Sequence, residues 1–154
     1  MNDMNVRIVD LAPMHVAAVH AFGPSPEGDA WAKLAAWAQP RGLFDDQAAH
    51  RIFGFNNPSP APGSPNYGYE FWIEVDRSTA ADDEVTLKEF AGGRYAVTHC
   101  KGVESIGPTW RRFVAWLETS PYRLGHHQWL EQHLGAADVV PEELELVLFM
   151  PLAG

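Results

Sequence analysis

The sequence repeats itself after 79 positions, and this duplication constrains the fold more than any local motif does. When the chain is shifted by that distance without a gap, identical residues fall on one another: Val6 on Val85, Ala17 on Ala96, His20 on His99, Gly23 on Gly102, Gly28 on Gly107, Trp31 on Trp110 and Trp37 on Trp116. The two tryptophan pairs carry most weight, because the chain has only 6 tryptophans. We therefore predict two copies of one folding unit.

Each copy begins with a segment that alternates like β-structure. The segments are VRIVDLAPMHVAAVHAFG at 6–23 and VTLKEFAGGRYAVTHCKG at 85–102. Pro13 interrupts the first, and Gly92 with Gly93 interrupts the second, which is typical of a tight turn. Each segment is therefore predicted to be a hairpin of two paired strands.

A helix is predicted after each hairpin, around residues 28–39 and 106–118. In both segments apolar residues recur at i, i+3, i+4 and i+7, so each helix buries one stripe. Asp29 and Thr109 are the expected N-caps. Trp37 and Trp116 lie beside the stripe, so they are either at the edge of the core or in the lining of a groove.

Two further strands complete each copy. They are RIFGF and YGYEFWIEV in the first copy, and HQWLEQHL and LELVLFMPL in the second, with the polar segment 77–84 as the linker. We therefore predict a single α+β domain over residues 1–154, with repeats at about 5–76 and 85–152. The expected fold is a tandem β-β-α-β-β duplication with pseudo-twofold symmetry, antiparallel sheets, one main helix per half and a central ligand cleft.

The stretch NYGYEFWIEV, residues 66–75, places carboxylates beside an indole ring. Strand alternation puts Glu70, Trp72 and Glu74 on one face. Aromatic ring faces attract cations, and a partly buried carboxylate attracts them more strongly than one in water. This pattern favours a site for a flat, apolar, positively charged organic molecule.

Composition excludes several other classes of function. Net charge −9 and pI near 5.1 disfavour direct nucleic-acid binding, and the sequence shows neither a signal peptide nor an apolar run that could span a membrane. The single cysteine, Cys100, is expected to be a buried residue in a reducing cytoplasm. His126, His127 and His133 do not make a metal-binding set, since the first two would point to opposite faces of a strand. No cofactor or catalytic motif is predicted.

Several segments together resemble the GyrI-like small-molecule-binding domain, which is the effector-binding module of AraC-type and MerR-type multidrug-responsive regulators. They are AVTHCKG before the helix TWRRFVAWL, then WLEQHL, and the terminal strand ending in FMPL. FGFNNP and YGYE also resemble family segments, whereas Val103 and Glu104 replace the usual Pro-aromatic pair.

The resemblance implies that Glu131 lies at the floor of a ligand pocket. In the family a tyrosine follows two residues later, where this chain has His133. A cationic imidazole there would compete with the ligand for Glu131. The full set of predicted ligand-binding residues is Glu131, Trp129, His133, Phe55, Tyr69, Glu70, Trp72, Trp37, Trp116 and Phe149.

Three functions remain open from the sequence. The first is a stand-alone cytoplasmic domain that senses or sequesters hydrophobic cationic aromatic compounds, with any role in transcription regulation acting through a protein partner or a homodimer. The second, implied by the resemblance, is a hydrolase that opens strained electrophilic rings, in which Glu131 activates water. The third is a protein-binding inhibitor of the gyrase-inhibitor type.

Overall fold

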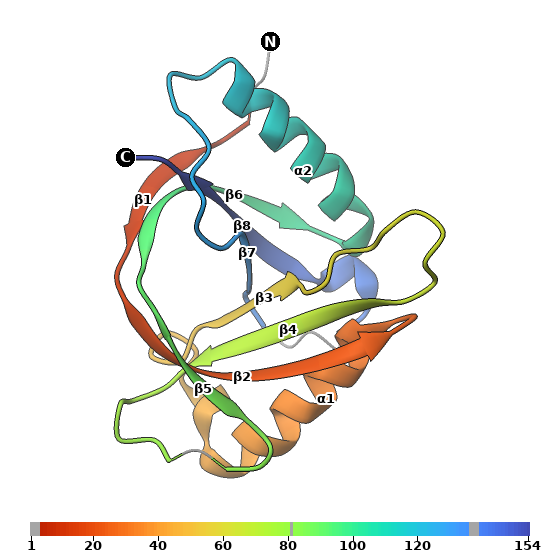
Figure 1. Ribbon diagram of the computed structural model, residues 1–154, viewed down its shortest axis with the longest axis vertical. Coiled ribbons are helices and arrows are strands. Elements are labelled where there is room, and N and C mark those ends of the chain that lie inside the picture. The colour runs from red at the N-terminus through yellow and green to blue at the C-terminus, as the bar shows by residue number, and fades with distance from the viewer. Residues whose placement is uncertain (1–3, 81, 136–138) are drawn as a thin grey trace. The chain divides into compact units, whose positions relative to one another are not determined.

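The computed structural model describes residues 4–80, 82–135 and 139–154. Figure 1 shows the elements in chain order: β1 (Arg7–Leu11), β2 (Met14–Gly23), α1 (Pro26–Ala38), β3 (Ile52–Asn56), β4 (Tyr67–Glu74), β5 (Thr86–Phe90), β6 (Gly93–Lys101), α2 (Val103–Glu118), β7 (Leu130–His133) and β8 (Glu145–Leu152). Short 3-10 helices lie at Gln39–Arg41, Leu43–Asp45 and Pro141–Glu143.

The elements form two compact units. The middle unit comprises Met14–Phe90, and the terminal unit comprises Met1–Pro13 with Ala91–Gly154. In the middle unit the strands lie in the order β3-β4-β2-β5, and in the terminal unit in the order β1-β6-β8-β7. Every pairing within these sets is antiparallel, and each unit has one α-helix. The predicted α+β class with a duplicated β-β-α-β-β unit is confirmed.

The two predicted hairpins were wrong, because the first strand of each repeat pairs outside its own repeat. β1 pairs with β6, where Leu11 lies opposite Gly93, and β5 pairs with β2, where Phe90 lies opposite Met14. Each compact unit therefore contains a first strand that the sequence repeat assigns to the other copy.

Gly92 lies where the chain passes close to the end of β1. Its φ is +81°, and a Cβ at this position would lie 2.2 Å from the carbonyl oxygen of Leu11. A side chain there is excluded by backbone, which no rotamer change can relieve. The glycine thus allows the end of β1 to pass close to the start of β6.

Both helices begin earlier than predicted. α1 starts at Pro26 after Ser25, so Asp29 lies inside the helix rather than at its N-cap. Proline is favoured at a first helical position because its fixed φ suits the helix and its missing N–H is not needed there. α2 starts at Val103, and Thr109 is a buried interior residue. Pro108 lies within α2.

Strand alternation and the helices define the core of each unit. In the terminal unit, Leu146, Leu148 and Met150 of β8 pack with Phe113 of α2. Cys100 belongs to this core, as predicted, and burial raises the pKa of its thiol. In the middle unit, α1 packs against β2 and β4 (Figure 1). In each unit, therefore, the helix covers one face of the strands.

Candidate functional site

Glu70 is the centre of a polar cluster on the middle unit. Phe71 faces α1, where its ring lies 5.6 Å from that of Trp31, so Glu70 and Trp72 project from the opposite face of β4. Trp72 Nε1 donates to Glu70 Oε2 at 2.6 Å, and Lys88 Nζ donates to the same oxygen at 2.7 Å. Asn57 Nδ2 donates to Oε1 at 3.1 Å. We call Glu70, Asn57, Trp72 and Lys88 the Glu70 cluster.

The Glu70 carboxylate is ionised although the residue is only 3% exposed. Burial raises its pKa, but the hydrogen bonds from Lys88, Trp72 and Asn57 lower it by more, so the pKa lies below the usual 4.5. The indole therefore lies beside the carboxylate as a hydrogen-bond donor. Phe55 extends the cluster, because its ring meets that of Trp72 at 5.0 Å in a T-shaped contact.

Glu131 forms a second carboxylate–indole pair, on the terminal unit. It lies opposite Leu148 in the β7–β8 ladder, on the face that packs against α2. Trp110 Nε1 of α2 donates to Glu131 Oε2 at 2.9 Å, and the rings of Trp110 and Trp129 lie 5.4 Å apart. We call Glu131, Trp110 and Trp129 the Glu131 cluster. Glu131 and both tryptophans are partly exposed.

His133 lies on the same face as Glu131 but is a buried residue. It lies opposite Leu146, a member of the terminal-unit core. Burial lowers its pKa from 6.5 to about 3. The imidazole is therefore neutral near pH 7, so it does not compete with a cation for Glu131.

This burial predicts a pH dependence of stability. Because the folded pKa of His133 lies below the unfolded value of 6.5, the unfolded chain takes up the proton first, and stability falls as pH drops below 6.5. The unfolding free energy should decrease by up to about 1.4 kcal/mol per pH unit from this group. Urea denaturation of the wild type and His133→Leu between pH 7 and pH 5 tests this, since the variant should lack that slope. Parallel pH curves would contradict it.

The structure distributes the other predicted ligand-binding residues elsewhere. Tyr69 contacts Phe71 at 5.0 Å on the helix-facing side of β4, away from Glu70. Phe149 lies on the face of β8 opposite Leu148, against Tyr95 at 5.4 Å. Trp116 stacks on Tyr122 at 6.1 Å near the end of α2. These three residues belong to neither carboxylate cluster.

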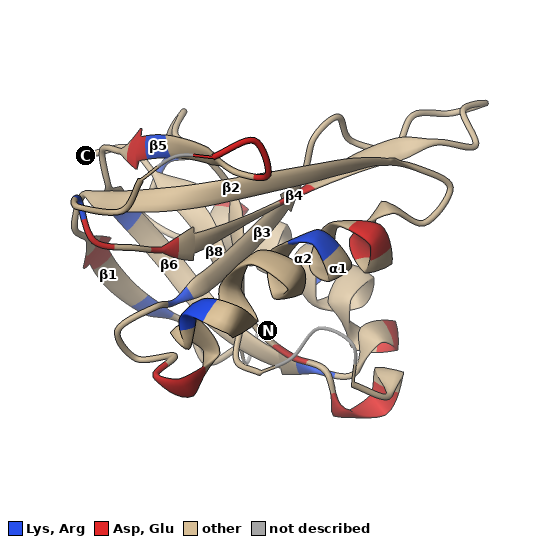
Figure 2. Cartoon of the chain, turned by 90° about the horizontal axis from the view of Figure 1, so that it is seen from below, with Lys and Arg blue, Asp and Glu red and all other residues tan. Residues whose placement is uncertain are grey.

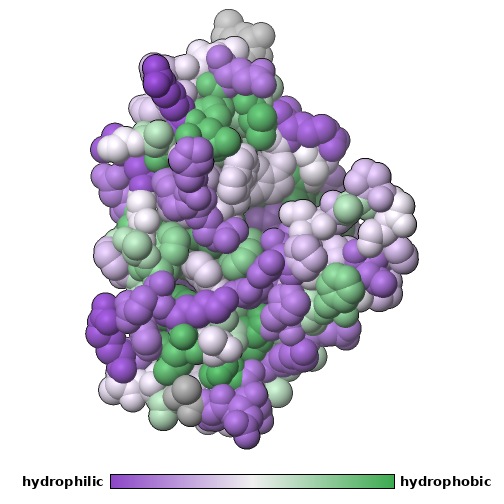
Figure 3. Space-filling model, in the orientation of Figure 1, coloured by the Kyte–Doolittle hydropathy of each residue, from purple (hydrophilic) through white to green (hydrophobic). Residues whose placement is uncertain are grey.

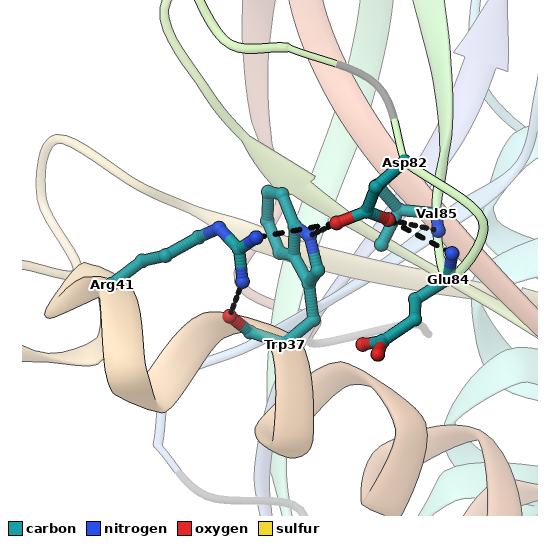
Figure 4. Close-up of polar contacts among 5 residues, drawn as sticks. All are labelled: Trp37, Arg41, Asp82, Glu84 and Val85. Carbon is teal, nitrogen blue, oxygen red and sulfur yellow. Dashed lines mark hydrogen bonds and ion pairs between the residues drawn. The ribbon is translucent and has the colours of Figure 1, made fainter.

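Trp37 is fully buried, and its indole fixes the predicted linker to α1 (Figure 4). Trp37 Nε1 donates to Asp82 Oδ2 at 2.9 Å, while the Asp82 Oδ1 accepts the backbone N–H groups of Glu84 and Val85 at 2.8 and 3.2 Å. The guanidinium of Arg41 lies 4.4 Å over the Trp37 ring and donates to the same carboxylate. The hydrogen bond that Asp82 accepts from the Glu84 N–H lowers the pKa of Asp82, and Trp37, Val85 and Arg41 lower it further. In this structure Trp37 has a packing and anchoring role.

Sequence reasoning missed two side chains that define the clusters. In the sequence, Trp110 lies in the apolar stripe of a predicted helix, and Lys88 lies within a predicted strand. The periodicity of α2 contained the signal for Trp110, because a residue at the margin of the buried stripe can reach the neighbouring strand. Lys88 carried no such signal, since its partner is 18 residues away and the pairing depends on the position of β5.

The surface shows both charge and apolar area. Figure 2 shows acidic residues in loops and at element ends of both units. Figure 3 shows apolar surface where α2 and the loop after it lie in Figure 1. Exposed large hydrophobic residues of these segments include Val114 in α2, and Tyr122 and Leu124 after it. Within 4–80, 82–135 and 139–154, no helix is long and apolar enough to cross a membrane. The same residues contain no cluster of three or more metal-binding side chains.

Comparison with known families identifies the chain. Residues 4–153 match the model of the GyrI-like small molecule binding domain. The chain belongs to the GyrI-like family. No curated protein matches the sequence of this GyrI-like domain.

Solved structures share the GyrI-like fold at low identity. A hydrolase from Listeria innocua superposes with a TM-score of 0.69 at 12% identity, over 99% of this chain and 94% of that one. The EcmrR C-terminal domain gives 0.69 at 13% identity, over 98% of both chains. SAV2435, solved bound to tetraphenylphosphonium, gives 0.57 at 15% identity, over 98% of this chain and 95% of that one. At these identities the likeness shows the fold alone.

Proposed function

We propose that this GyrI-like domain binds hydrophobic, cationic aromatic compounds at the Glu131 cluster and serves as a sensor or sequestering domain for them. The observation that carries the proposal is the hydrogen bond from Trp110 to Glu131, with a second indole, Trp129, beside it. The carboxylate supplies a counter-charge, and the ring faces attract both the cation and its aromatic substituents.

The surroundings of Glu131 support a cationic ligand over a neutral one. Because His133 is neutral near pH 7, it adds no positive charge of its own beside Glu131. The overall charge of −9 also favours the approach of cations. The solved complex of SAV2435 with tetraphenylphosphonium offers a matching example of an aromatic cation in this family's fold.

Tetraphenylphosphonium is the first ligand to test. We expect saturable binding that quenches tryptophan fluorescence, because Trp110 and Trp129 would contact the ligand. Trp110→Phe and Trp129→Phe should each reduce the quenching, while Trp37→Phe, at the anchoring site in the other unit, should leave the ligand-induced change intact. Absence of saturable binding by calorimetry would overturn the proposal.

A second function, hydrolysis of a strained electrophilic ring, is supported by the same carboxylate. The hydrogen bond from Trp110 orients one oxygen of Glu131, and a general base likewise needs an oriented carboxylate. The structural neighbour from Listeria innocua is a hydrolase. A strained-ring alkylating compound separates the two functions: a binder holds at most one equivalent, whereas a hydrolase turns it over repeatedly and loses turnover in Glu131→Gln. We expect the first outcome.

A further inference from the structure

The Glu70 cluster of the middle unit already contains a cation. Lys88 Nζ lies 2.7 Å from Glu70 Oε2, and this carboxylate is almost completely buried. The Lys88 side chain is 42% exposed, whereas that of Glu70 is 5% exposed. The ammonium group therefore covers a buried negative charge from the side of the solvent.

A small cavity adjoins this ion pair. Its volume is about 160 Å³, and its polar lining residues are Glu70, Lys88, Glu84, Thr86, His20 and Lys33. Lys33 Nζ donates to the His20 carbonyl oxygen at 2.8 Å, so this second ammonium group is held by the backbone. That volume corresponds to about five water molecules at their share of liquid volume. The cavity gives Lys88 room to leave Glu70, and the exposed carboxylate of Glu84 offers it a second acidic partner there.

The neutral partners of Glu70 would remain in place if Lys88 moved. Trp72 is buried, and its Nε1 lies 2.6 Å from Oε2; Asn57 lies 3.1 Å from Oε1. These two donors would keep the carboxylate oriented, but the positive charge that balances it would be lost, and with it the largest of the interactions that lower its pKa. A buried carboxylate in that state requires another cation.

We propose that the Glu70 cluster is a second cation site, specific for small organic ammonium ions, and that Lys88 is a tethered ammonium group that occupies it until such an ion displaces it. The size of the cavity selects small ions such as tetramethylammonium over aromatic cations. The site lies in a different unit from Glu131, so it does not depend on the function proposed above. The apparent affinity for such an ion equals the intrinsic affinity multiplied by the fraction of time for which Lys88 leaves Glu70 uncovered.

The decisive comparison is Lys88→Met with Lys88→Arg. Methionine keeps an unbranched stem and removes the charge, whereas arginine keeps the charge. By calorimetry, Lys88→Met should bind tetramethylammonium about tenfold more tightly than the wild type does, as expected if Lys88 leaves the site open about a tenth of the time. Lys88→Arg should resemble the wild type, and adding Glu70→Gln to Lys88→Met should abolish the gain. A folded Lys88→Met that binds no more tightly overturns the proposal.

A measurement on the wild type gives an answer even if Lys88→Met fails to fold. Tetramethylammonium should increase the rate at which an amine-acylating reagent labels Lys88, read by mass spectrometry at constant ionic strength. Lys101, which is 52% exposed and at least 3.8 Å from its acidic neighbours, is the internal reference and should not change. Unchanged labelling of Lys88 overturns the proposal. The response should persist in Glu131→Gln, which separates this site from the Glu131 cluster.

Discussion

Replacing Glu131 with glutamine is expected to weaken the binding of tetraphenylphosphonium by about tenfold or more, equivalent to about 1.4 kcal/mol or more of binding free energy. Glutamine keeps the shape of the side chain and can still accept the Trp110 hydrogen bond through its carbonyl oxygen. What it loses is the counter-charge in a partly desolvated site, where charge is worth more than in water. Calorimetric titration of both proteins measures the difference.

The control ligand is triphenylphosphine oxide, which is aromatic but carries no net charge. Its affinity should fall much less in Glu131→Gln, since ring contacts with Trp110 and Trp129 remain. Glu145→Gln is the matched control variant, because Glu145 is also a partly exposed glutamate and lies on the neighbouring strand β8. Equal losses for both ligands would show that the carboxylate does not select for charge, and equal losses in both variants would show that the Glu131 position has no special role.

The duplication was readable from the sequence because both copies retain the same spacing of apolar residues and tryptophans. Strand pairing was not readable in the same way. Alternation shows that a segment is a strand and which residues share a face, but it does not show which strand lies beside it. The exchange of β1 and β5 depends on a close backbone approach at Gly92, and a glycine has the same appearance in a sequence whether it forms a turn or admits a neighbour.

The carboxylate sites show a similar division. Alternation and the family resemblance indicate the pairs Glu70 with Trp72 and Glu131 with Trp129. Their effective partners come from distant positions: Lys88 from β5 and Trp110 from α2. These partners change the chemistry of the two sites. Glu70 forms an ion pair with Lys88, and Glu131 accepts a hydrogen bond from the indole of Trp110. Only the fold reveals these partners.

Replacing Glu70 with glutamine should destabilise the protein by about 2–3 kcal/mol near pH 7. The carboxylate accepts three hydrogen bonds, and two of them converge on Oε2. An amide has one acceptor oxygen, so at least one donor would face an N–H group inside the unit, and Lys88 would lose its ion pair. Partial exposure of Lys88 keeps the expected loss below that for a fully buried pair.

Glu74→Gln provides a control on the same strand, because Glu74 pairs with Arg51 at 2.9 Å but is more exposed, and the loss of this pair should cost less than about 1 kcal/mol.

The difference in unfolding free energy between the wild type and Glu70→Gln should also depend on pH. Because the folded pKa of Glu70 lies below the unfolded value of 4.5, its stabilisation is complete above pH 4.5 and is lost as pH falls through the folded pKa. Urea denaturation from pH 7 to pH 3 should show the gap narrowing below pH 4.5, and a gap that stays constant would show that ionisation of Glu70 does not stabilise the middle unit.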